Sequence, residues 1–181
     1  LVLNLGGGNK RYGFGQEVNL DIADFPQVDV IADAHQLPFK NGSFDLVVAN
    51  AFLEHVRDPQ RVVGEIYRVL RKGGMVYANT PFLQRYHCYP QDYSRWTLEG
   101  LRCLFGQFKT IKMGVSAGPW VSFVEFNIQI LKLISRERKI IFYPLSAMLL
   151  IVLMTLRPFF LLIPRRKEYV LANAFYYLGE K

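Results

Sequence analysis

Cysteine is scarce in this sequence, and no motif typical of a disulfide framework or a zinc site is present. The 181 residues include two cysteines, Cys88 and Cys103, and neither lies in a CxxC spacing. We expect free thiols rather than a disulfide, because the rest of the sequence is typical of an intracellular protein. No triple of His, Cys and carboxylate residues has the spacing of metal ligands, so the sequence predicts no metal.

Internal repeats, low-complexity segments and a secretory signal are missing as well. Hydrophobic residues make up 51% of the chain, which excludes global disorder. The length suits one α/β domain with a real core. Because the first residue is Leu1 and already lies in an apolar run, we expect that the chain is a fragment or that residues precede it.

Acidic residues are scarce in the second part of the chain. Residues 61–181 carry 18 Lys or Arg and 7 Asp or Glu, a net charge of +11, whereas residues 1–60 carry 4 and 8, a net charge of −4. A basic half is typical of proteins that bind nucleic acid or an anionic membrane.

Short apolar runs alternate with amphipathic helical patterns. The clearest helix has Asp58 as its N-cap and Pro59 in its first turn, and the pair Gly73-Gly74 is expected to end it. A second helix is expected after the cap residue Thr97. This alternation predicts a doubly wound, mostly parallel sheet. Its predicted strands cover residues 1–5, 17–22, 28–32, 44–49, 75–79, 111–115 and 169–178.

Glycines or aspartates end the first three predicted strands. Gly6-Gly7-Gly8 follows the first, Asp21 ends the second and Asp33 follows the third. The carboxyl ends of parallel strands meet at one edge of a sheet, where ligands bind. A carboxylate there can accept hydrogen bonds from ribose hydroxyls or an adenine amino group. Ordinary turn or surface aspartates remain the alternative.

The spacing around the glycines argues against a dinucleotide. A GxGxxG fingerprint from Gly6 needs a glycine at position 11, where Arg11 stands. Few residues separate Gly8 from Glu17, too few for the full helix whose N-terminus would bind a pyrophosphate. S-adenosylmethionine has no phosphate and tolerates a short helix, so the sequence favours it over NAD.

Several motifs resemble the type 11 branch of the class I S-adenosylmethionine-dependent methyltransferases: LNLGGG, VNLDI, ADAHQLPFKNGSFDLVVANAFLEHV and EIYRVLRKGGMVYANTP. The resemblance covers residues 1–116 and the final strand. It implies a Rossmann-like seven-stranded sheet with an antiparallel last strand. One departure is Asn4, where relatives often carry an acid that holds the cofactor's ammonium group. The implied cofactor contacts are Asn4, Gly6, Gly7, Gly8, Asp21, Ile22, Asp33, Ala34, His35, Asn50 and Ala51.

The segment 81–97, PFLQRYHCYPQDYSRWT, is a second candidate site. It resembles a loop found in a subset of these methyltransferases that are often encoded near glycan biosynthesis enzymes. His87 is a candidate general base that Asp92 would orient, and Arg95 is a candidate contact for an anionic group. Tyr93 and His55 are candidate substrate contacts. The alternative is that Asp92, Tyr93 and Arg95 only fix the loop.

About fifty residues separate the last two predicted strands. Ile140–Leu156 contains no charged residue, Arg157 and Pro158 interrupt the run, and basic residues flank it. The run is slightly short for a membrane span, and a final strand that returns to the sheet excludes a single crossing. We therefore expect an interfacial helix or a shallow re-entrant hairpin on an anionic membrane. The alternative is a core or homo-oligomer contact through residues 140–163, and nucleic acid is not expected.

These observations predict a methyltransferase core at 1–116, an apolar helical insertion at 117–168 and a final core strand at 169–181. The expected cofactor is S-adenosyl-L-methionine, and the expected acceptor is a small or lipid-linked molecule such as a saccharide. We expect the protein in the cytoplasm, peripheral on the inner membrane face. The alternatives are an inactive Rossmann-like module that serves as a membrane-proximal scaffold, and an NAD(P)-binding protein.

Overall fold

The computed structural model describes residues 1–136 and 138–181 and divides into two compact units. The first unit comprises residues 1–81, 87–114 and 175–181. The second comprises residues 82–86 and 115–174. The sequence-based boundaries at 116/117 and 168/169 lie close to these, but the short segment 82–86 joins the second unit.

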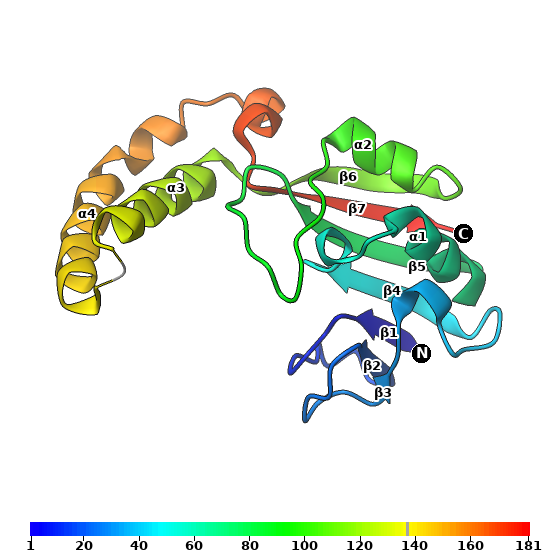
Figure 1. Ribbon diagram of the computed structural model, residues 1–181. Coiled ribbons are helices and arrows are strands. Elements are labelled where there is room, and N and C mark those ends of the chain that lie inside the picture. Colours follow the sequence, from blue (N-terminus) through cyan, green and yellow to red (C-terminus); the bar gives the residue numbers. More distant parts are fainter. Residues whose placement is uncertain (137) are drawn as a thin grey trace. The chain divides into compact units, whose positions relative to one another are not determined.

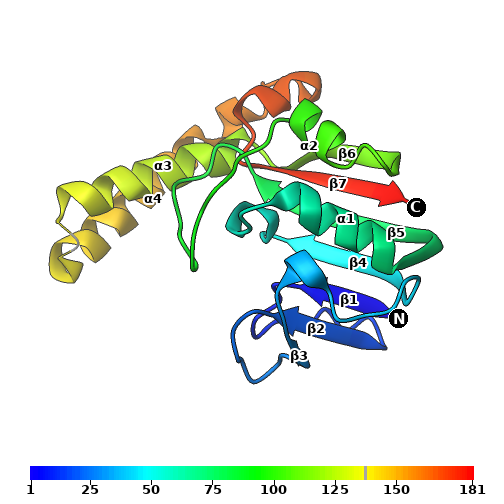
Figure 2. The same ribbon diagram turned by 45° about the vertical axis from the view of Figure 1, so that its right-hand side comes forward.

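A seven-stranded sheet has the order β3-β2-β1-β4-β5-β7-β6 (Figure 1). The pairs β3-β2, β2-β1, β1-β4 and β4-β5 are parallel. The β7 arrow points opposite to that of β5 (Figure 2), as the predicted topology requires. The strands are β1 Val2–Leu5, β2 Glu17–Asp21, β3 Val30–Ile31, β4 Phe44–Asn50, β5 Leu70–Pro81, β6 Lys109–Ala117 and β7 Ala174–Glu180.

Helix α1 (Pro59–Val69) lies in front of the sheet in both views (Figures 1 and 2), and helix α2 (Leu98–Leu104) packs beside it. Both predicted caps are confirmed: the Asp58 carboxylate accepts from the Arg61 amide, and the Thr97 hydroxyl accepts from the Gly100 amide. The apolar face of α1 is fully buried through Val62, Val63, Ile66 and Val69.

Two predicted element boundaries are wrong. Helix α1 ends at Val69 and β5 begins at Leu70, because the Gly73 amide and the Gly74 carbonyl both pair with Lys181 next to β7. The glycine pair therefore belongs to the strand. The last strand begins at Ala174 instead of residue 169, since Arg165–Leu171 forms a 3₁₀ helix.

The second unit contains helices α3 (Pro119–Ile134) and α4 (Lys139–Phe160), which pack against each other. Helix α4 is 22 residues long; it includes Pro144 and Pro158 and ends at Phe160, two residues after Pro158. By length and composition alone α4 could cross a membrane, and its apolar segment is almost wholly exposed. The rings of Trp120, Phe123 and Phe160 join the two helices, with centroids 5.1–6.1 Å apart.

A loop without a helix, residues 6–16, connects β1 to β2, as the short spacing predicts. Gly7 lies between the buried side chains of Asn4 and Asn19. A Cβ atom on Gly7 would stand 2.0 Å from Asn19 Oδ1 and 2.2 Å from Asn4 Nδ2. Asn19 Nδ2 donates to the carbonyl of Gly8 at 2.8 Å. The two asparagines thus hold the turn and leave no room for a side chain.

Gly7→Ala should destabilise the protein by about 1–3 kcal/mol, because the new methyl group overpacks a buried polar pair. Gly64→Ala is the matched control. Gly64 lies inside α1, and a Cβ atom there would meet no described atom within 4 Å, so alanine should stabilise by about 0.5–1 kcal/mol. Urea unfolding measures both changes, and equal effects from the two substitutions would refute the packing argument.

Candidate functional site

A pocket of about 1210 Å³ lies at the carboxyl ends of strands β1 to β4. It exceeds the roughly 300–1,000 Å³ usual for small-molecule sites. Most residues singled out from the sequence line it. They are Gly6, Gly7, Gly8, Asp21, Ile22, Asp33, Ala34, His35, Asn50, Ala51, His55 and Tyr93.

The glycine turn is joined directly to Asp21. Asp21 Oδ2 accepts from the Gly8 amide at 3.0 Å, and Oδ1 accepts from the Ala23 amide at 3.0 Å. These bonds fix the carboxylate at the sheet edge. Gly6 has a φ of +64°, and a Cβ there would lie 2.3 Å from the Phe52 ring. The backbone therefore carries no side chain at the point where a ligand can approach it.

Asp33 and His35 form a second fixed part of the pocket wall. Asp33 Oδ1 accepts from the His35 amide at 2.9 Å and lies 2.6 Å from His35 Nδ1. The hydrogen bond from the His35 amide is the main cause that lowers the pKa of Asp33. His35 Nε2 accepts from the Asp58 amide at 3.2 Å, so Nδ1 carries the proton in the neutral ring. His35 is thus held in place at both nitrogens.

Asn4 does not line the pocket. It is 1% exposed, and its Nδ2 donates to the Lys10 carbonyl at 3.1 Å. The implied cofactor contact is therefore replaced by a structural one, which shapes the glycine turn from beneath.

Ala51, directly after β4, has a φ of +50°. This left-handed conformation is strained for a residue with a Cβ and costs roughly 1–3 kcal/mol. Its amide donates to the Asn79 carbonyl at 2.9 Å, which holds the strained residue at the pocket wall. Such strain is frequent at ligand-binding sites.

The loop candidates His87, Asp92 and Arg95 are absent from the residues that line this pocket. The Asp92 side chain, 1% exposed, accepts from the His87 amide at 2.8 Å and from both terminal nitrogens of Arg95. The Arg95 hydrogen bonds hold the pKa of Asp92 at about 2. Asp92 is therefore ionised and engaged, which favours the interpretation that it and Arg95 fix the loop.

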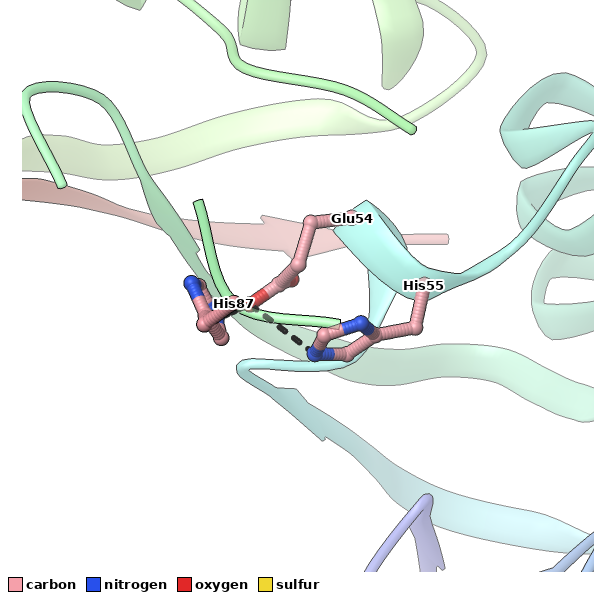
Figure 3. Close-up of side chains that lie close together, drawn as sticks. All are labelled: Glu54, His55 and His87. Atoms are coloured by element: carbon pink, nitrogen blue, oxygen red, sulfur yellow. Dashed lines mark ion pairs between the residues drawn. The ribbon is translucent and has the colours of Figure 1, made fainter. Parts of the chain in front are cut away.

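His87 instead meets a residue that sequence reasoning missed (Figure 3). Glu54, on the 3₁₀ turn Leu53–His55, is fully buried, and burial raises the pKa of its carboxyl group. Its Oε1 lies 3.8 Å from Nε2 of both His55 and His87. The Tyr93 amide donates to the Glu54 carbonyl at 2.7 Å and ties the loop to this turn. The available signal was a lone acid within the apolar run AFLEHV.

Two aromatic residues were missed as well. Phe25 and Tyr89 both line the pocket, and their rings stack with centroids 6.4 Å apart. They come from a loop after β2 and from the 81–97 segment, and nothing in the sequence indicates that these segments meet.

Comparison with known proteins gives a consistent result. Residues 14–78 match the family model of the methyltransferase domain. Norajmaline N-methyltransferase from Rauvolfia serpentina is 33% identical over 67 residues, which are 37% of this chain and 20% of that protein. The aligned segments span only 12–23% of the lengths of the curated relatives that the chain matches.

Two solved structures share the fold over 99% of the chain. The [4+2]-cyclase SpnF has a TM-score of 0.63 at 15% identity, covering 99% of this chain and 74% of that one. A phospholethanolamine N-methyltransferase from Haemonchus contortus, in complex with S-adenosylhomocysteine, has a TM-score of 0.57 at 16% identity. That match covers 99% of this chain and 48% of the other.

Asp92→Ala should release the loop and destabilise the protein by about 2–4 kcal/mol, because it leaves the Arg95 guanidinium and the His87 amide without this acceptor. Limited trypsin digestion should cleave after Arg95 much faster, and urea unfolding should give the loss of stability. Asp24→Ala removes an exposed carboxylate and serves as the control. Unchanged trypsin cleavage in Asp92→Ala would show that Asp92 does not organise the loop.

Proposed function

We propose, starting from the match of residues 14–78 to the methyltransferase domain, that the chain is a class I S-adenosylmethionine-dependent methyltransferase, which binds S-adenosylmethionine in the pocket at the ends of β1 to β4 and methylates an acceptor beside it. The single observation that carries this proposal is the hydrogen bond between the Gly8 amide and Asp21. It brings a bare glycine turn and a carboxylate to one edge, as an adenosyl group requires.

The residues present fit this cofactor. Asp21 would accept from the ribose, Asp33 and the backbone of Ala34 would meet the adenine, and the glycine turn would leave space for the amino-acid part. When bound, the cofactor supplies a methyl group already activated by its sulfonium. The protein's own task is to orient the two reactants and exclude water.

The acceptor is proposed to be a saccharide or a lipid-linked molecule. The support is the pocket volume, which leaves room beside a nucleoside, and the resemblance of the 81–97 loop to that of glycan-associated relatives. A non-catalytic, membrane-proximal module remains the alternative, because Asn4 brings no charge for the cofactor's ammonium group and the loop 6–16 contains no helix.

Asp21→Ala should weaken S-adenosylmethionine binding by about 1–3 kcal/mol, or roughly 5- to 150-fold, through loss of an acceptor for the ribose. Isothermal titration calorimetry measures the affinity. Asp24→Ala, which removes an equal charge three residues away and outside the pocket, should leave it unchanged. No binding by the unmodified protein at millimolar ligand would favour the scaffold, and tighter binding of NAD(P) would favour the dinucleotide alternative.

We further propose that the second unit docks on an anionic membrane surface. Exposed apolar side chains run along α4, including Met148 at 61%, Ile151 at 71% and Val152 at 54% exposure. Basic residues flank both of its ends, and each contributes about 1 kcal/mol near an anionic surface. An apolar surface of this kind facing water needs a partner, and lipid suits both the helix and its flanks.

The double substitution Met148→Asp with Ile151→Asp should abolish flotation with liposomes that contain phosphatidylserine, because it puts charge into the apolar face. Ile111→Asp, at an exposed apolar position of β6, is the control and should float normally. Flotation should weaken in high salt. A native protein that never floats but dimerises, with the dimer lost in the double variant, would assign α4 to an oligomer interface.

A further inference from the structure

Three side chains near the pocket form a cluster whose geometry the methyltransferase proposal leaves unexplained (Figure 3). Glu54 and His55 come from the turn after β4, and His87 comes from the loop after β5. One carboxylate oxygen and two imidazole nitrogens lie within 4.8 Å of one another. His55 also lines the pocket, so the cluster borders it.

The two histidines are oriented in the same way. His55 Nδ1 is hydrogen-bonded to the Gln91 carbonyl, which accepts only, so Nδ1 carries the proton and Nε2 presents its lone pair. His87 Nδ1 lies 3.6 Å from Asp92 Oδ2, and its Nε2 also faces Glu54. A backbone carbonyl or a carboxylate behind one ring nitrogen is the usual support of a histidine that binds metal through the other.

Glu54 supplies an independent observation. Its side chain is 0% exposed, and neither carboxylate oxygen has a hydrogen-bond partner among the described residues. An unpartnered buried carboxylate is costly by several kcal/mol if it is charged, and a bound ion is one of the arrangements that satisfies such a group in native proteins. The distances of 3.8 Å to the two histidines exceed a hydrogen bond but suit a cation placed between them.

We propose that Glu54, His55 and His87 bind one divalent transition metal ion, with zinc as the reference ion, at the wall of the pocket. Two imidazoles and one carboxylate suit Zn²⁺ and its neighbours and not Mg²⁺, which prefers oxygen ligands. Tetrahedral ligands with bonds near 2.1 Å are roughly 3.4 Å apart, so the two separations of 3.8 Å between Glu54 and the histidines shorten by about 0.4 Å on binding. Three protein ligands leave a coordination position open.

One consequence rests on the proposed function. An acceptor hydroxyl that occupies the open position loses its proton to water more readily, because a bound metal lowers the pKa of its oxygen ligands. The oxygen then forms a bond to the methyl carbon, and the electron pair of the broken carbon–sulfur bond stays on sulfur. The metal thus specifies hydroxyl acceptors, and the chain needs no separate general base.

The test is calorimetric titration of untagged, metal-free protein with Zn²⁺, without S-adenosylmethionine. All variants are made in a protein that carries Cys88→Ser and Cys103→Ser, called the background. The two thiols are removed because both are exposed, Cys88 adjoins His87, and thiolates bind zinc. One equivalent should bind with a Kd in the micromolar range or below. Glu54→Gln and His87→Ala should each weaken binding at least tenfold. His35→Ala, which removes the one histidine outside the cluster, should bind as the background does.

Further readouts keep the test decisive if Glu54→Gln does not fold. Co²⁺ should give visible absorption bands that His87→Ala, a loop substitution, removes, and Mg²⁺ should not compete. Absence of one-equivalent binding, or equal affinity in the background and His87→Ala, overturns the metal site. Titration of the same sample with S-adenosylmethionine separates the two ideas: cofactor binding without zinc binding rejects only the metal, and the reverse rejects only the methyltransferase proposal.

Discussion

The hydrogen bond from the Gly8 amide to Asp21 is the contact on which the pocket depends. It joins the turn after β1 to the end of β2, and the buried asparagines Asn4 and Asn19 hold that turn from below. Because the strands are parallel, the loops that follow their carboxyl ends all lie at the same edge of the sheet. The strained Ala51, the fixed His35 and the turn carrying Glu54 are all placed by this one rule.

The part of the fold that follows from local pattern could be predicted. Strand ends marked by glycine or aspartate and the helix caps Asp58 and Thr97 all rest on contacts between near neighbours in sequence. The errors lie where a distant strand decides the outcome. The pair Gly73-Gly74 is typical of a helix end. Lys181, more than a hundred residues away, forms backbone hydrogen bonds with both glycines, and these bonds place them in the sheet. Similarly, residues 169–171 have the apolar and aromatic character of a strand but belong to the 3₁₀ helix Arg165–Leu171.

The same limit applies to the site. The residues that follow single strands were identified, because each needs only its own strand end to be placed. Asn4 was misplaced, since side-chain direction on a buried strand does not follow from the motif. The meeting of Glu54 with His87 joins two loops more than thirty residues apart and has no spacing signature. For this reason the sequence predicted no metal ligands. The pairing of Asp92 with Arg95 is local, yet the sequence alone left open whether it serves substrate or loop.

The helical hairpin of the second unit begins and ends at nearly the same point of the chain's path. The Asn173 amide donates to the Ala117 carbonyl at 2.8 Å, so the fifty-odd residues between them form a loop that is closed at its base. A segment attached in this way can be shortened, lengthened or exchanged without altering the order of the strands, since closure of a longer loop adds only about 0.6 kcal/mol per doubling. Insertion at this point therefore lets the second unit vary while the strand ends that line the pocket keep their arrangement.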